Sequence, residues 1–247
     1  MLLLPGAVLP AELAYGQLVA ELGADVEAVT KELELYAGAE PPPGYTLLHE
    51  VDGVLREADA RGWDRFHLVG YSGGGAASIV CAARCPERLA SLALIEPAWG
   101  GSWGRSAQEL AFWNEYEQIE GLAPEDLLPA FMRLALAPGV EPPPPPAGDP
   151  PPWMASRPAG IRAFGRAFEA DDTSREALER FSAPVYIALG GLSNPHHYGE
   201  IATRLARTFP DCELEVFEER HHFDPPHRIE PERVARALRA LWDRAGD

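Results

Sequence analysis

The sequence predicts an α/β fold with a mostly parallel central sheet, helices on both faces and a helical segment inserted in the middle. Short apolar runs alternate with longer amphipathic stretches, which is the pattern of βαβ units. The chain has 247 residues, of which 46% are hydrophobic, so it can bury a large core. Because the alternation is interrupted between residues 99 and 181, we expect a core at 1–98 and 182–247 and an insertion at 99–181.

The elements of the first part follow from the positions of the apolar residues. Three leucines predict a buried strand at 2–4, and helical periodicity predicts a helix at 9–22 that ends at Gly23. A poorer alternating run predicts a strand at 26–35, and three consecutive prolines make 39–44 a loop. The remaining elements expected before the insertion are a helix at 46–62, a strand at 66–69, a helix at 76–84 and a strand at 89–95.

The insertion has a different character from the core. Helical pieces are expected at 108–118 and 124–136, and the proline-rich stretch 141–152 predicts a loop, either a spacer or the hinge of a lid. Alternation then resumes. The elements expected there are a strand at 184–189, a helix at 201–209, a strand at 213–217 and a closing helix at 231–242.

Charge and composition exclude several classes of partner. The formal net charge of −17 predicts repulsion from nucleic acids and from anionic membranes. The three cysteines lack metal-like spacing, so we expect free core thiols, a reducing cytoplasm, no metal and no cofactor. The first residues lack the features of a signal peptide, and no window approaches about 20 apolar residues. A small-molecule substrate is the expected partner, and the sequence gives no indication of oligomeric state.

The sharpest chemical signal is the run Gly70-Tyr71-Ser72-Gly73-Gly74, which matches the pattern G-x-S-x-G. An apolar strand leads into it and a helix of small residues follows, which is the setting of a nucleophilic serine on a tight turn. The glycines would let strand and helix approach closely, and the Gly73 amide would face an oxyanion. A plain glycine-rich turn is the alternative, whereas a phosphate loop would need a lysine that is absent.

The segment 66–97, FHLVGYSGGGAASIVCAARCPERLASLALIEP, resembles the central strand, turn, helix and strand of the α/β-hydrolase superfamily, in its serine-nucleophile branch. The resemblance extends over nearly the whole chain and is weak across 99–181, where that family carries a variable cap. It implies an α/β-hydrolase fold, shortened at the N-terminus to about six strands, with a cap or lid. Serine rather than aspartate at position 72 argues against the haloalkane dehalogenase and epoxide hydrolase branches.

The resemblance also implies a histidine base after the last strand. Three histidines lie in that stretch, and His222, followed by Phe223, fits the family pattern best. His221 is the alternative, and His227 is expected to cap or solvate the approach to the last helix. The base is needed because a hydroxyl at its ordinary pKa is a poor nucleophile.

The third member of the site departs from the common family pattern. Asn194 stands where an aspartate is usual, and an asparagine carries no charge to stabilise a cationic imidazole. Glu96 ends the strand at 89–95, where a carboxylate is costly unless it is paired. We therefore expect Glu96 to be the acid, with an exposed strand end as the alternative reading and Asp224 as a weaker candidate.

The resemblance implies a second oxyanion amide after the first strand, where Leu4-Pro5-Gly6 leads to Ala7. The predicted activity is hydrolysis of an ester, thioester, amide or activated C–C bond in a small, apolar substrate through an acyl-enzyme. Two alternatives remain: a catalytically silent binding protein, suggested by Asn194 at the usual position of the acid, and an acyltransferase or perhydrolase.

Aromatic side chains of the insertion are expected mostly to pack its own core and partly to line the pocket. They are Trp99, Trp103, Phe112, Trp113, Tyr116, Phe131, Trp153, Phe164 and Phe168, together with Met132.

Overall fold

The structure, a computed structural model, describes residues 1–144 and 148–246, so residues 145–147 of the predicted proline-rich loop lie outside it. In the described part of the chain, six strands form one sheet in the order β2-β1-β3-β4-β5-β6, with every neighbouring pair parallel. The predicted parallel sheet is therefore confirmed. The strands are β1 (Leu2–Leu4), β2 (Val29–Thr30), β3 (Phe66–Tyr71), β4 (Leu89–Ile95), β5 (Val185–Gly190) and β6 (Cys212–Phe217).

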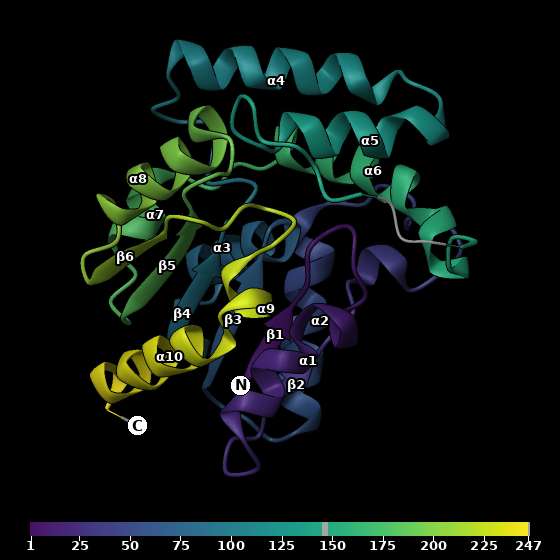
Figure 1. Ribbon diagram of the computed structural model, residues 1–247. Coiled ribbons are helices and arrows are strands. Elements are labelled where there is room, and N and C mark those ends of the chain that lie inside the picture. Colours follow the sequence, from purple (N-terminus) through teal and green to yellow (C-terminus); the bar gives the residue numbers. More distant parts are fainter. Residues whose placement is uncertain (145–147, 247) are drawn as a thin grey trace.

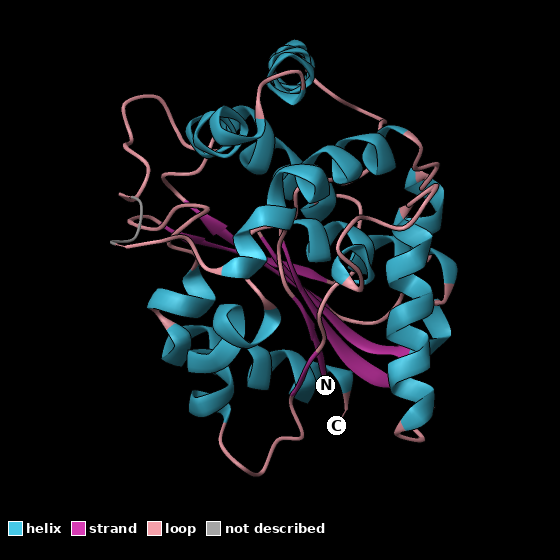
Figure 2. Ribbon diagram, turned by 90° about the vertical axis from the view of Figure 1, so that its right-hand side faces the viewer, coloured by secondary structure: helices cyan, strands magenta, loops and turns pink. Residues whose placement is uncertain are grey.

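Helices cover both faces of this sheet (Figures 1 and 2). The α-helices are α1 (Ala11–Leu22), α2 (Leu47–Ala60), α3 (Gly73–Arg84), α4 (Ala107–Glu120), α5 (Pro124–Leu134), α6 (Arg157–Glu169), α7 (Arg175–Glu179), α8 (Glu200–Ala206), α9 (Pro226–Ile229) and α10 (Pro231–Ala245). Shorter helical turns are η1 (Glu34–Tyr36), η2 (Pro86–Arg88), η3 (Pro152–Ser156) and η4 (Pro195–Gly199). Helices α1 and α10 lie side by side on one face, and α2 and α3 pack together on the other.

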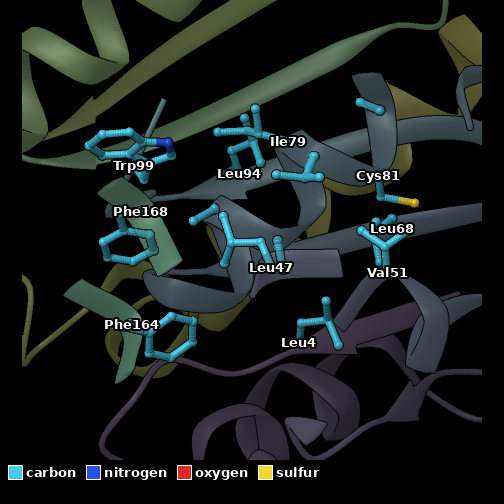
Figure 3. Close-up of a cluster of buried hydrophobic side chains, with 14 of the residues drawn as sticks. Leu4, Leu47, Val51, Leu68, Ile79, Cys81, Leu94, Trp99, Phe164 and Phe168 are labelled. Carbon is cyan, nitrogen blue, oxygen red and sulfur yellow. The ribbon is translucent and has the colours of Figure 1, made fainter. Parts of the chain in front are cut away.

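Successive strand residues point to opposite faces and join two apolar clusters. The cluster under α2 and α3, drawn in Figure 3, includes Leu4, Leu68, Leu94, Val51 and Ile79. The cluster under α1 and α10 includes Leu3, Val69, Ile95, Leu18 and Leu238. Burial of the sheet on both faces explains why the strands expected at 2–4, 66–69, 89–95 and 184–189 are mostly apolar.

Several expected elements differ in their bounds from the structure, and two of these differences have a clear physical cause. The strand predicted at 26–35 is reduced to Val29–Thr30, because the chain turns into η1, where the buried Glu50 carboxylate accepts hydrogen bonds from the amides of Glu34 and Leu35. The helix predicted at 76–84 begins earlier, at Gly73, directly after Ser72. Its three leading glycines are weak helix formers and hid this start.

Within residues 99–181, the described elements are helical: α4 to α7 and the turn η3. Helices α4, α5 and α6 lie together at one end of the molecule, above the sheet in the view of Figure 1. Phe164 of α6 reaches the turn after β3, since a side chain on Gly73 would meet its ring at 2.5 Å. Helix α6 therefore lies over the turn at the carboxyl end of β3. In the described part of the chain, every helix falls short of the length and apolarity that a bilayer crossing would require.

Candidate active site

Ser72 occupies a strained turn between β3 and α3. Its backbone has φ 54° and ψ −118°, and its side chain is almost fully buried. The surrounding glycines are required by space: a Cβ on Gly70 would lie 2.4 Å from the carbonyl oxygen of Gly74, and one on Gly74 would lie 2.4 Å from that of Pro5. Such strain persists only where packing enforces it, and it is typical of functional positions.

His222 reaches this serine from the loop after β6. Its Nε2 atom lies 3.0 Å from the Ser72 Oγ atom, a hydrogen-bond distance, and its ring stacks on Tyr198 at 4.1 Å. His221 is engaged elsewhere: its Nδ1 atom accepts hydrogen bonds from the Phe223 and Asp224 amides. Of the two histidines considered for the base, the structure places His222 beside the serine.

Glu96 faces the other side of the His222 ring. Its Oε2 atom lies 3.3 Å from Nδ1 of His222, within ion-pair distance, and neither atom has a hydrogen-bond partner among the described residues. The Oε1 atom accepts hydrogen bonds from the Gly190 amide, at 2.8 Å, and from the Ser193 hydroxyl. Glu96 is fully buried and has φ 46°. Across the described ranges, it and Ser72 are the two non-glycine residues with positive φ.

Asn194 and Asp224 lie in other arrangements. The Asn194 side chain donates to the Leu134 carbonyl at 2.8 Å and accepts from the His196 amide at 3.0 Å. Asn194 therefore caps η4 and ties it to the end of α5. Asp224 is 46% exposed at its side chain and faces His221, 3.6 Å from its Nε2 atom.

The two residues whose amides are predicted to hold an oxyanion lie at the same cavity as Ser72. Ala7 and Gly73 both line it, and a Cβ on Gly6 would lie 2.9 Å from the Ser72 Cβ. Neither amide nitrogen donates a hydrogen bond to any residue in the part of the chain that the structure describes. Two free N–H groups beside a serine hydroxyl suit a developing negative charge.

The cavity beside Ser72 is small and apolar. The space open to the centre of a water molecule is about 20 Å³, enough for roughly one water. Its wall comes mainly from α4, α5 and α6, which contribute Phe112, Trp113, Tyr116, Phe131, Ile161, Phe164 and Phe168. The remaining aromatic residues singled out in the sequence, Trp99, Trp103 and Trp153 with Met132, lie outside this lining.

His197 and Tyr198 also line the cavity, and sequence reasoning missed both. Both lie on η4, which begins directly after Asn194, the position where an aspartate is usual. The adjacent aromatic residues His197 and Tyr198 were the signal that the sequence offered. The His197 ring is buried and stacks on Phe112 at 3.9 Å. Burial, and then the nearby His222, lower the pKa of His197 well below its ordinary value, so the ring is neutral.

His227 contradicts its predicted role as a cap or solvated residue. It is fully buried between the rings of Tyr15 and Tyr71, and both ring nitrogens lack hydrogen-bond partners among the described residues. Burial lowers its pKa to about 3.

Cys81, Cys85 and Cys212 are free thiols, and no cluster of His, Cys, Asp or Glu suited to a metal occurs in residues 1–144 or 148–246.

Comparisons with known proteins add a family and a fold. A sequence model of the alpha/beta hydrolase family matches residues 1–237. A Caulobacter vibrioides protein named "Putative carbamate hydrolase RutD" is 41% identical over 56 residues. This match spans 23% of the present chain and 21% of the relative, so the chain matches about a fifth of the length of that relative.

Solved structures with the same fold include three hydrolases. An esterase from Thermogutta terrifontis has a TM-score of 0.71 and 20% identity, covering 99% of this chain and 89% of its own. A bacterial membrane phospholipase A has a TM-score of 0.72 and 23% identity, with 100% and 79% covered. A meta-cleavage product hydrolase from Pseudomonas fluorescens has a TM-score of 0.65 and 18% identity, with 99% and 90% covered. These matches confirm the predicted fold.

Proposed function

The chain belongs to the alpha/beta hydrolase family, and from this premise we propose that it is a serine hydrolase working through an acyl-enzyme. The observation that supports the proposal is the line from Ser72 through His222 to Glu96, with separations of 3.0 and 3.3 Å. A nucleophile, a base in contact with it and an acid behind the base are the arrangement that acyl transfer by serine requires.

In the proposed reaction, His222 Nε2 takes the proton of the Ser72 hydroxyl as Oγ attacks the carbonyl carbon of the substrate. The carbonyl electrons move to oxygen, and the resulting oxyanion is held by the Gly73 and Ala7 amides. The imidazolium, stabilised by Glu96, then gives its proton to the leaving group, and the acyl-enzyme remains. Water, deprotonated by the same histidine, attacks the ester and releases the acid and free Ser72.

The cavity supports a small substrate whose acyl part is apolar and uncharged. Its wall is mostly aromatic, and its one additional imidazole, that of His197, is neutral. An anionic acyl group would lose hydration there without gaining a cationic partner. We propose that residues 99–181 act as a cap, because α4, α5 and α6 supply most of this wall and their side chains must shift to admit anything larger than water.

The proposal is tested with a fluorophosphonate probe on wild type and on Ser72→Ala, followed by a panel of acyl esters, thioesters, amides and carbamates. Carbamates are included because of the name of the Caulobacter relative. We expect labelling of wild type that Ser72→Ala abolishes, and hydrolysis of short neutral esters. Folded wild type that neither labels nor hydrolyses would support the catalytically silent alternative, and faster turnover with added alcohol or peroxide than with water would support the acyltransferase or perhydrolase.

A further inference from the structure

The loop that carries Ala7 is held by side chains from two distant parts of the chain. The Tyr36 hydroxyl donates a hydrogen bond to the Ala7 carbonyl at 2.6 Å. The Nε atom of Arg157, the first residue of α6, donates to the Val8 carbonyl at 2.8 Å. The guanidinium of Arg157 also lies over the Tyr36 ring, 3.8 Å from its centre, so the two side chains form one unit, here called the loop clamp.

The peptide that presents the Ala7 N–H lies between two fixed points. On one side the Pro5 carbonyl accepts a hydrogen bond from the Gly74 amide at 3.0 Å, which joins the loop to the serine turn. On the other side the loop clamp holds the carbonyls of Ala7 and Val8. Gly6, between them, has the widest backbone freedom of any residue, so without the clamp the Gly6–Ala7 peptide could rotate.

The loop clamp is itself supported by buried groups. Tyr36 belongs to η1, whose amides at Glu34 and Leu35 donate to the buried carboxylate of Glu50 at 2.8 and 2.9 Å. Helix α6 makes room for the Tyr36 hydroxyl at Gly160, where a Cβ would lie 2.1 Å from the hydroxyl oxygen. Arg157 is only 2% exposed, so its charge is placed at this point with little freedom.

We propose that Tyr36 and Arg157 are positioning residues that orient the Ala7 amide toward the oxyanion, so that the docked position of α6 completes the oxyanion site. The inference rests on the proposed function, because it assigns a role within the same reaction. Neither side chain touches the reacting atoms. Their effect is expected on the transition state, where the oxyanion exists, and not on binding of the neutral substrate.

The test compares Tyr36→Phe with Tyr15→Phe in steady-state hydrolysis of a short neutral ester. Both variants remove one hydroxyl that donates to a backbone carbonyl, at Ala7 in one case and at Leu4, at 2.7 Å, in the other. Complete loss of an oxyanion donor costs about 100- to 1,000-fold in kcat. Tyr36→Phe leaves the amide in place but loosens it, so we expect kcat to fall roughly 10-fold with KM within about twofold. Tyr15→Phe is expected to keep both values near wild type.

A second readout separates positioning from loss of stability. A trifluoromethyl ketone inhibitor forms a tetrahedral oxyanion on the serine, so its inhibition constant should rise in Tyr36→Phe by the same factor as kcat/KM falls. Gly160→Ala, which adds a methyl group where the Tyr36 hydroxyl lies, should give the same phenotype without removing a hydrogen-bonding group. Arg157→Lys replaces the planar guanidinium, which stacks on the Tyr36 ring, with an ammonium group. We expect kcat to fall in this variant while KM is retained.

The outcomes distinguish this inference from the proposed function. If wild type fails to hydrolyse the panel and fails to label, the proposed function fails first. If wild type is active and labels at Ser72, but Tyr36→Phe and Gly160→Ala keep wild-type kcat and inhibitor affinity, the loop clamp is overturned. An equal loss of kcat in Tyr15→Phe and Tyr36→Phe would also overturn it, since the effect would then follow from stability.

Discussion

The Oε2 atom of Glu96 lies 3.3 Å from the Nδ1 atom of His222, and neither atom has a hydrogen-bond partner among the described residues. The strand before Glu96 is buried along its whole length, so the carboxylate lies where an unpaired charge would be costly. Its other oxygen is held by the Gly190 amide and the Ser193 hydroxyl, which fixes the direction in which Oε2 points. The proposed acid thus stands at the end of β4, and its carboxylate is supported by the last residue of β5 and by the turn that follows.

The first prediction concerns the charge of this residue. Glu96→Gln keeps the shape of the side chain and removes the negative charge that would stabilise a cationic His222. In a serine protease triad the equivalent change lowers kcat about 10,000-fold. We expect a fall of at least roughly 100-fold, measured as kcat on the best ester of the panel. Full activity in Glu96→Gln would remove the assignment of the acid.

Asn194→Asp is the matched control for this assignment. The amide of Asn194 donates to the Leu134 carbonyl, and an aspartate there would place two acceptors against each other. We expect no gain in kcat and a loss of about 1–3 kcal/mol in the free energy of unfolding, measured by urea denaturation. Activity restored by Asn194→Asp in the Glu96→Gln background would show instead that the position after β5 can serve as the acid.

Much of the fold and of this site could be predicted from sequence because the signals are local. The apolar runs of β3 and β4 are short and bounded by turn residues. The glycines around Ser72 indicate that other backbone segments pack closely against this turn. Glu96 could be found because a carboxylate directly after a buried strand needs a partner.

The parts that sequence could not give depend on contacts between distant segments. The hydrogen bond from Tyr36 to Ala7 joins residues 29 apart, and that from Arg157 to Val8 joins residues 149 apart. The strand predicted at 26–35 was shortened by the Glu50 carboxylate, which captures two amides of η1. The expectation that His227 caps or solvates the approach to the last helix is wrong, because a histidine before a helix has the same local pattern whether it is buried or exposed.

The second prediction tests the close approach at the serine turn. Gly74→Ala would place a Cβ 2.4 Å from the Pro5 carbonyl oxygen and 2.6 Å from that of Leu4, and backbone atoms cannot move aside cheaply. We expect loss of at least about 2 kcal/mol of stability, or failure to fold. Gly16→Ala, on the exposed face of α1 with no atom within 4 Å, should instead stabilise by about 0.5–1 kcal/mol. Thermal unfolding of both variants measures the contrast.

The third prediction concerns acid stability through His227. Its pKa is about 3 in the folded protein, because burial disfavours the charged ring, and about 6.5 when unfolded. Above pH 6.5 the ring is neutral in both states. As the pH falls from 6.5 toward 3, the unfolded chain binds a proton that the folded chain does not, and stability falls by up to about 1.4 kcal/mol per pH unit.

His227→Phe removes this titration and leaves no hydrogen bond unpaired, since both ring nitrogens already lack partners among the described residues. The free energy of unfolding, measured by urea denaturation between pH 7 and pH 4, should therefore decline less steeply in the variant. Parallel curves for wild type and variant over this range would contradict the prediction.

The last prediction concerns which acyl chains the cavity admits. Phe164 lies over the serine turn and lines the cavity, which has room for roughly one water molecule. Phe164→Leu removes part of this wall, so longer chains should gain access. We expect the ratio of kcat/KM for a hexanoyl ester over an acetyl ester to rise about 10-fold, the value of roughly two buried methylene groups. Phe181→Leu is the matched control, because Phe181 is fully buried against Phe209, away from the cavity lining. Both variants should lose less free energy of unfolding than the roughly 3–5 kcal/mol typical of Phe→Ala. A ratio that changes in Phe164→Leu alone would therefore follow from the shape of the cavity. An unchanged ratio in Phe164→Leu would place the acyl chain elsewhere.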